Sequence, residues 1–334
     1  MVTADDAEST SIHFDGGRTL AALAAPVLAV VAAVQGQHPP RPPLDPTPRG
    51  CARPFRVAVI DMFYPGDYSF GSRRERDQQF QVRDAVDVDG DGVRDPYYHG
   101  DIVSFYVNDP AIEIVPYVVG NLTTAKEQIA HHLATIQDQI GRGEPLDAIL
   151  LAWESSTLII SLDDVIRIEH AAAYKARLRK WRDENDEWRW TYEIVMRLED
   201  IAASGVAVYT IAGNSGERMI NIYTLAEGVT AVGAEEGSVD ADWSCRNAFV
   251  DTLAPAIYHV RRIRGGSDQS SGYDLNEDGI PDVPLERVSS YHGPPGMDSH
   301  ADTVLWGSSY AVATAVKRHF AQVAAQCAEQ AGAR

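Results

Sequence analysis

Four side chains in this sequence could together carry out nucleophilic catalysis by a hydroxyl group. A serine hydroxyl needs a base to take its proton, and the base needs an acidic partner that fixes its tautomer and stabilises its protonated form. The negative oxygen that develops on the attacked carbonyl needs hydrogen-bond donors aimed at it. The candidates for these four roles are Asp61, His99, Ser309 and Asn214.

The segments around these residues predict strands that alternate with helices. Short apolar runs rich in Val, Ile and Ala, typical of buried parallel strands, occupy residues 56–61, 113–119, 147–153, 205–213 and 229–234. Amphipathic periodicity predicts helices over residues 123–140 and 192–203. We therefore expect an α/β fold, a three-layer sandwich with a mostly parallel central sheet and helices on both faces.

Chemically competent residues follow the predicted strands. Asp61 ends the first strand, Trp153-Glu154-Ser155 follows the third, and Gly213-Asn214-Ser215-Gly216 follows the fourth. Ser309 opens a predicted helix, whose first backbone N–H groups would add donors for an oxyanion. Taken singly, these signals are weak, because such residues are more often part of a cap or a loop. Their joint order on the strand ends favours catalysis, because ligands of parallel sheets bind beyond that edge.

The same segments resemble the subtilisin-like serine peptidases, or subtilases. The similar motifs are VAVID up to Asp61, the His99-Gly100 pair, AASGVAVYTIAGNSG at residues 202–216 and GSSYAVATAV around Ser309. The resemblance covers about residues 55–325 and implies a subtilisin-like sandwich. It also implies a serine endopeptidase acting on peptide or protein substrates through an acyl-enzyme.

The resemblance assigns a role to each candidate residue. Ser309 is the implied nucleophile, His99 the base, Asp61 its partner and Asn214 the oxyanion donor. The segment after the third strand is implied to line the substrate cleft, with Trp153 and Glu154 as substrate-binding residues.

Several positions depart from the usual pattern of that family, although none of the departures removes a catalytic group. We therefore predict a divergent member with unusual pocket walls. Two alternatives stay open: a catalytically silent protein that uses the fold for binding, and a dedicated maturation peptidase for one secreted protein. The departures are Met62-Phe63, Ile102, Ser308, Tyr310 and Ala313.

Two acidic loops, residues 87–95 and 274–282, predict structural calcium sites. Each has oxygen-bearing side chains at positions 1, 3, 5 and 9 and a glycine at position 6. Ca²⁺ takes roughly six to eight oxygen ligands, and this spacing wraps a loop round one ion. An ordinary acidic turn is the alternative, but two copies of the pattern favour calcium. The candidate ligands are Asp87, Asp89, Asp91 and Asp95 in the first loop and Asp274, Asn276, Asp278 and Asp282 in the second.

The N-terminal part of the chain differs from the rest in composition. Residues 1–35 contain an uncharged, alanine-rich run at 19–34 that predicts a signal or anchor segment; a surface helix packed on the domain is the alternative. Residues 36–54 contain seven prolines and predict an extended linker, so that the peptidase-like domain occupies residues 55–334. We expect a protein that is secreted or tethered to a membrane outside the cytoplasm, with a cytoplasmic location as the alternative.

The charge of the chain and its few cysteines exclude some classes of ligand and of scaffold. Lys plus Arg total 29 and Asp plus Glu total 48, a formal net charge of -19, so we expect no nucleic-acid binding. The three cysteines, Cys51, Cys245 and Cys327, are too few for a disulfide scaffold and lack zinc-site spacing, but they allow one disulfide and one free thiol.

An insertion at about residues 157–190 is rich in charged residues and contains aromatic ones. It predicts an exposed helix or helix pair, and a more specific hypothesis is that this segment binds a protein partner.

Overall fold

A computed structural model describes residues 53–63, 99–120, 123–236, 241–263 and 302–332, together with four strand segments at 85–86, 95–96, 272–274 and 283–284. All of these belong to one compact unit of the chain, Pro40–Arg334. None of the helices formed by these residues is long and apolar enough to span a membrane. The predicted signal or anchor segment and nearly all of the predicted linker lie outside the described residues.

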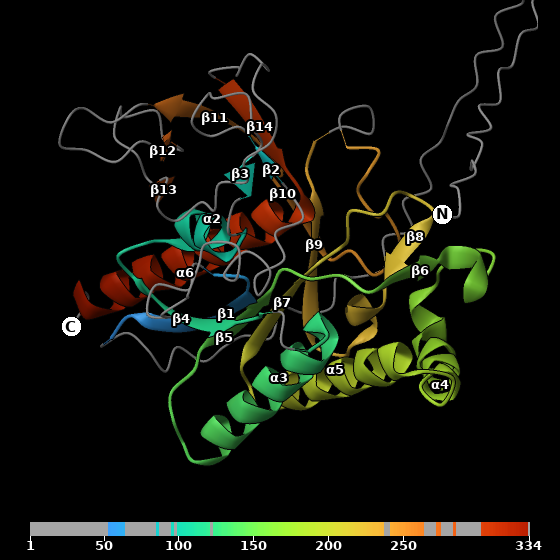
Figure 1. Cartoon of the computed structure of the whole chain (residues 1–334). Coiled ribbons are helices and arrows are strands. Elements are labelled where there is room, and N and C mark those ends of the chain that lie inside the picture. The colour runs from blue at the N-terminus through green and yellow to red at the C-terminus, as the bar shows by residue number, and fades with distance from the viewer. Residues whose placement is uncertain are drawn as a thin grey trace, which may run out of the picture. The chain divides into compact units, whose positions relative to one another are not determined.

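Six strands form a central sheet in the order β10-β9-β7-β5-β1-β4, and every pairing in it is parallel. The predicted α/β fold, with a parallel sheet between two helical layers, is confirmed (Figure 1). The strands are β1 (Phe55–Asp61), β4 (Ile112–Val118), β5 (Ala148–Leu151), β7 (Ala207–Ile211), β9 (Val229–Ala234) and β10 (Thr252–Ala254).

Alternate residues of each strand enter two separate cores, because successive side chains of a strand point to opposite faces. In β1, Val57 and Val59 pack in the core beneath α2 (His99–Val107) and α6 (Ser308–Gly332). Ala58 and Ile60 pack in the core on the other face. Both faces of the sheet are therefore buried, which explains why the strands read as continuous apolar runs rather than alternating ones.

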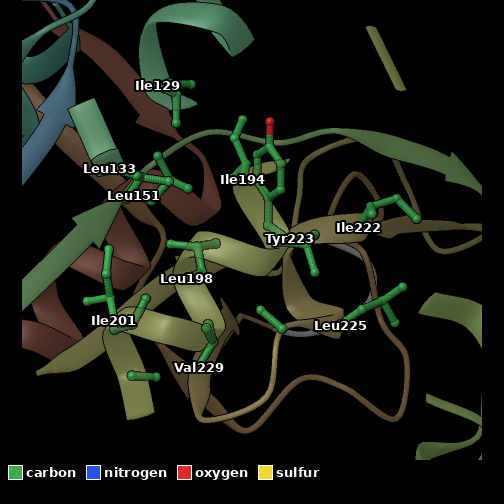
Figure 2. Close-up of a cluster of buried hydrophobic side chains, with 14 of the residues drawn as sticks. Ile129, Leu133, Leu151, Ile194, Leu198, Ile201, Ile222, Tyr223, Leu225 and Val229 are labelled. Carbon is green, nitrogen blue, oxygen red and sulfur yellow. The ribbon is translucent and has the colours of Figure 1, made fainter. Parts of the chain in front are cut away.

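The second core is formed against α3 (Ala125–Gly141) and α5 (Asp186–Ala203) (Figure 2). Leu133 of α3, Leu198 of α5 and Leu151 of β5 are fully buried there. Truncating one such leucine to alanine costs about 2–5 kcal/mol, so this core is a main source of stability. The side chains labelled in Figure 2 are Ile129, Leu133, Leu151, Ile194, Leu198, Ile201, Ile222, Tyr223, Leu225 and Val229.

Side-chain caps explain where these two helices begin. The Thr124 hydroxyl accepts a hydrogen bond from the backbone N–H of Glu127 before α3, and Asn185 accepts one from Trp188 before α5. Such caps satisfy N–H groups that have no partner inside the helix.

The remaining strands form one small antiparallel sheet and two strand pairs, and α4 and η3 contribute side chains to the second core. A four-stranded antiparallel sheet has the order β13-β12-β11-β14, and two two-stranded pairs are β2–β3 and β6–β8. The last strand of the four leads directly into α6. The bounds are β2 (Ala85–Val86), β3 (Asp95–Pro96), β6 (Ser156–Leu158), β8 (Met219–Asn221), β11 (Ile257–Ile263), β12 (Gly272–Asp274), β13 (Val283–Pro284), β14 (Asp302–Trp306), α4 (Ala171–Trp181), η1 (Ile159–Ser161), η2 (Ile168–His170) and η3 (Ile222–Leu225).

Candidate active site

An aspartate and a histidine form a close pair at the end of β1. The Nδ1 atom of His99 lies 2.8 Å from Oδ2 and 3.0 Å from Oδ1 of Asp61, which is fully buried. An ionised carboxylate can only accept hydrogen bonds, so the pairing places the imidazole proton on Nδ1. A neutral imidazole in this tautomer carries its lone pair on Nε2.

Glycine at position 100 is what allows this pair to form. His99 is the first residue of α2, and the backbone N–H of Gly100 donates to the carbonyl of Met62 at 2.7 Å. A Cβ atom on residue 100 would lie 2.6 Å from that carbonyl oxygen and 2.9 Å from the Cβ of Asp61. Any larger residue would push α2 away from β1, which gives a steric reason for the His-Gly pair in the sequence.

Ser309 is buried at the start of α6, and the residue after it contacts the histidine. The ring of Tyr310, the next residue, lies with its centroid 5.8 Å from that of His99. Gly307 turns the chain from β14 into α6 with a φ of +151°, a left-handed conformation that L side chains rarely adopt. The structure thus brings the Asp61–His99 pair near the first turn of α6, to which Ser309 belongs.

Asn214 reaches the same place from the end of β7. Its side-chain Oδ1 accepts hydrogen bonds from the backbone N–H of Ser308 at 2.8 Å and from the Ser308 hydroxyl at 2.7 Å. Because the carbonyl end of the amide is engaged in this way, its Nδ2 donors remain for another acceptor. A Cβ atom on Gly307 would lie 3.5 Å from that Nδ2, so the amide lies against the turn that precedes Ser309.

The two adjacent serines of this turn differ in their hydrogen bonding. The Ser308 hydroxyl donates to Asn214, whereas no hydrogen bond of the Ser309 hydroxyl occurs within the described part of the chain. The two hydroxyl groups therefore have different surroundings, and the Ser308 hydroxyl is the one that supports Asn214. The sequence did not indicate this role of Ser308, and its only signal was the doubling of serine after glycine.

Trp153 and Glu154 point in different directions from the loop after β5. The indole N–H of Trp153 donates to the carbonyl of Ile60 at 3.0 Å, and its ring packs against the second core. The Glu154 carboxylate accepts hydrogen bonds from the backbone N–H of Asn214 and from the Ser215 hydroxyl. Glu154 thus faces the asparagine loop.

A buried asparagine, Asn221, joins the loops that follow β5 and β7. Its side-chain Nδ2 donates to the carbonyl of Ile211 at 2.8 Å and to that of Trp153 at 3.3 Å. Its Oδ1 accepts from the backbone N–H of Ser155 at 3.0 Å. Sequence reasoning missed this residue, because one asparagine in a short polar segment gives no signal of its contacts.

Cys245 is a free thiol buried against the asparagine loop. Its backbone N–H donates to the carbonyl of Gly213 at 3.0 Å. Burial raises the pKa of the thiol to about 11, so it stays protonated at neutral pH. Cys327 in α6 forms a disulfide.

The predicted calcium ligands fall largely outside the described residues. Asp274 is buried in β12, and Asp95 belongs to β3. Within the described ranges, no group of three or more His, Cys, Asp or Glu residues could hold a metal ion. The ligands that lie outside these ranges are Asp87, Asp89, Asp91, Asn276, Asp278 and Asp282.

Comparisons with known proteins add the following findings. No family model matches the chain, and no curated protein matches it. The structure is similar to a lanthipeptide protease, with 15% identity, a TM-score of 0.41 and coverage of 80% of this chain and 72% of that one. It is similar to the prenylagaramide maturation protease PagA, with 14% identity, a TM-score of 0.38 and coverage of 79% and 72%.

A further similar structure is the PatG macrocyclase in complex with peptide, with 12% identity, a TM-score of 0.43 and coverage of 86% of this chain and 82% of that one. Likeness at these scores carries no argument about function. The class of protein is therefore defined by fold and site together: a parallel α/β sandwich with an Asp–His pair, a helix-initiating serine and an asparagine amide at one edge of the sheet.

Proposed function

We propose that this protein is a serine endopeptidase that hydrolyses peptide bonds through an acyl-enzyme. The observation that carries the proposal is the Asp61–His99 contact at 2.8 Å, with the His99 ring against Tyr310, the residue that follows Ser309. A nucleophile, a base and a partner for the base are the three groups that acyl transfer from an amide requires.

In the first step, the Ser309 oxygen attacks the scissile carbonyl while His99 takes its proton on Nε2. The imidazolium that forms is stabilised by Asp61, whose carboxylate already accepts from Nδ1. His99 then gives the proton to the leaving amine, and the acyl group stays on Ser309. Water attacks this ester with His99 again as the base, which releases the acid and restores the serine.

Asn214 supplies the donor for the oxyanion in both steps. Its Nδ2 is left unengaged by the contacts that its Oδ1 makes with Ser308. The backbone N–H groups at the start of α6 add to this donor, because the beginning of a helix carries partial positive charge. Removing one preorganised donor of this kind costs about 10²–10³ in turnover.

Labelling with a fluorophosphonate probe tests the proposal, with adjacent serines as a matched pair. We expect stoichiometric labelling of the wild type, none of Ser309→Ala, and retained labelling of Ser308→Ala. Absence of labelling in a folded, calcium-loaded wild type would contradict the proposal and favour the alternative of a catalytically silent binding protein.

We also propose that the two acidic loops bind Ca²⁺ for stability and that the protein works outside the cytoplasm. The support is the spacing of oxygen ligands in residues 87–95 and 274–282 together with the apolar run at 19–34. Calorimetric titration of the metal-free protein with Ca²⁺ tests the first point, and N-terminal sequencing of the mature protein tests the second.

A further inference from the structure

The carboxylate of Glu154 lies directly against the loop that carries Asn214. Glu154 follows β5 and Asn214 follows β7, and these two strands pair in parallel with Leu151 opposite Thr210. Their ends leave the same edge of the sheet as neighbours. Oε2 of Glu154 accepts from the backbone N–H of Asn214, and Oε1 accepts from the Ser215 hydroxyl.

The fit of this carboxylate depends on glycine at position 213. Gly213 has a φ of +113°, and a Cβ atom there would lie 3.0 Å from Oε2 of Glu154 and 2.8 Å from Sγ of Cys245. A side chain at residue 213 would therefore displace the carboxylate from the backbone. The space that a side chain at residue 213 would need is thus occupied by the Glu154 carboxylate and the thiol of Cys245.

Glu154 itself is held in place by its neighbours. The carbonyl of Trp153 and the N–H of Ser155, on either side of it, are hydrogen-bonded to the side chain of Asn221. The same side chain donates to Ile211, the last residue of β7, at 2.8 Å. The Glu154 backbone is thus fixed relative to the strand from which the Asn214 loop begins.

Asn214 is consequently fixed at both ends, its backbone by Glu154 and its side-chain carbonyl by Ser308. We propose that Glu154 is a positioning residue that holds the backbone of Asn214 so that the Nδ2 donors face the oxyanion formed at Ser309. This inference rests on the proposed function. In this role Glu154 fixes the position of the oxyanion donor and does not recognise a charged side chain of the substrate.

The hydrogen bonds of Glu154 favour positioning over recognition of a basic substrate side chain. Its two carboxylate oxygens already accept from Asn214, from Ser215 and, at 3.2 Å, from the Ser156 hydroxyl. A hydrogen bond from N–H to a charged acceptor is stronger than a neutral one, which suits it to fixing a loop. Small displacements of a catalytic group are costly, and 1 Å of misplacement can cost about 10² in rate.

The test measures kcat and KM separately for variants of Glu154. We expect Glu154→Ala and Glu154→Asp to lower kcat about 10- to 100-fold, with KM unchanged, since neither side chain reaches the Asn214 N–H. Glu154→Gln should recover most of this loss, because its amide oxygen can still accept from that N–H. Ser156→Ala, which removes the longest of the three contacts, is the matched control and should behave as wild type.

A double-mutant cycle shows whether Glu154 acts through Asn214. If it does, Glu154→Ala adds no further loss in an Asn214→Ala background, because the group that it positions is already gone. Full additivity overturns the proposal, and so does unchanged kcat in both Glu154→Ala and Glu154→Asp. A loss of lysine or arginine preference in Glu154→Gln at unchanged kcat would assign Glu154 to substrate recognition instead.

An NMR measurement on the Ser309→Ala protein tests the positioning role of Glu154 without relying on peptidase activity. In the Ser309→Ala protein, the backbone amide resonance of Asn214 should lie far downfield, as a hydrogen bond to a carboxylate requires. It should move upfield in Glu154→Ala and stay in place in Ser156→Ala. An unmoved resonance overturns the positioning role, whereas failure of the proposed function shows separately, as an absence of fluorophosphonate labelling in the wild type.

Discussion

Two buried serines, Ser309 and Ser155, have different basic residues in their neighbourhood. Ser309 precedes Tyr310, whose ring centroid lies 5.8 Å from that of His99, the partner of Asp61. Ser155 is buried, and its hydroxyl lies 2.8 Å from Nζ of Lys126 and 2.9 Å from the Thr191 hydroxyl. A serine close to lysine could be mistaken for a catalytic dyad.

The basic residues near the two serines, Lys126 and His99, differ in their hydrogen bonds. Lys126 also donates to Glu187 at 2.7 Å, and this hydrogen bond lowers the pKa of the Glu187 carboxyl. A lysine ammonium held by a carboxylate has three donors and no lone pair, so it cannot take the proton of Ser155. In contrast, a neutral His99 imidazole that donates from Nδ1 to Asp61 carries a lone pair on Nε2. A basic residue near a serine is therefore not enough for the proposed chemistry, because the base must also be able to accept a proton.

Replacing each serine by alanine tests this contrast with the largest expected effect. Ser309→Ala should lower turnover of a peptide substrate by about 10⁴-fold or more while the protein remains folded. Ser155→Ala should leave turnover unchanged and lower the free energy of unfolding by about 1–3 kcal/mol, because it leaves buried polar groups without their partner. Kinetics and urea unfolding of both variants check this. Equal losses of activity would remove the distinction between the two serines.

The oxyanion donor should show the next largest effect. Asn214→Ala should lower kcat by about 10²–10³ with little change in KM, because the amide acts on charge that develops only in the transition state. Ser308→Ala should cost less, since it removes the hydroxyl contact with Asn214 and leaves the backbone one. Steady-state kinetics on one peptide substrate would show which of the two variants loses more kcat. A larger loss in Ser308→Ala would point to that hydroxyl as a direct donor.

Removal of calcium should disturb the surroundings of His99 more than those of Ser155. Asp95, the last predicted ligand of the first loop, precedes His99 by four residues, so opening of that loop would displace the base. If the loops bind Ca²⁺, a concentration a hundredfold above Kd would stabilise the folded state by about 2.7 kcal/mol. We expect a chelator to lower both the melting temperature and the activity, and Asp89→Ala to lose activity at temperatures where Asp278→Ala keeps it. Identical melting curves with and without chelator would argue against both sites.

The smallest expected effect is the change in melting temperature with pH that two partly buried histidines outside the candidate site cause. Burial lowers the pKa of His132 in α3 and of His319 in α6, so the fold favours their neutral forms. Stability from these residues is therefore complete above their ordinary pKa of about 6.5 and decreases as the pH falls below it. His132→Gln, whose amide can still donate to the carbonyl of Val118, should reduce the drop in melting temperature between pH 7.5 and pH 5. An unchanged drop would assign the acid sensitivity to other groups.

The strands and the order of the site residues were predictable from the sequence, because both depend on local patterns. The apolar run at 56–61 corresponds to β1 (Phe55–Asp61), and the run at 229–234 to β9 (Val229–Ala234). The predicted strand 205–213 is longer than β7 (Ala207–Ile211), because the left-handed Gly213 already belongs to the turn that presents Asn214.

The contacts that fix these residues were not predictable, because each joins segments far apart in the chain. Ser308 lies 94 residues from Asn214, and Asn221 lies 66 residues from Ser155. The direction of the Glu154 carboxylate depends on space left by Gly213 and on the N–H of Asn214.

The sequence alone therefore determined which residues end the strands and begin the last helix, since hydrophobic period and turn residues act within a few positions. Only the tertiary structure decided that the Ser308 hydroxyl bonds to Asn214, that the Ser155 hydroxyl bonds to Lys126, and that the Glu154 carboxylate bonds to the asparagine loop. Side-chain direction and hydrogen-bond partners are set by packing between strands, and no local pattern encodes that packing.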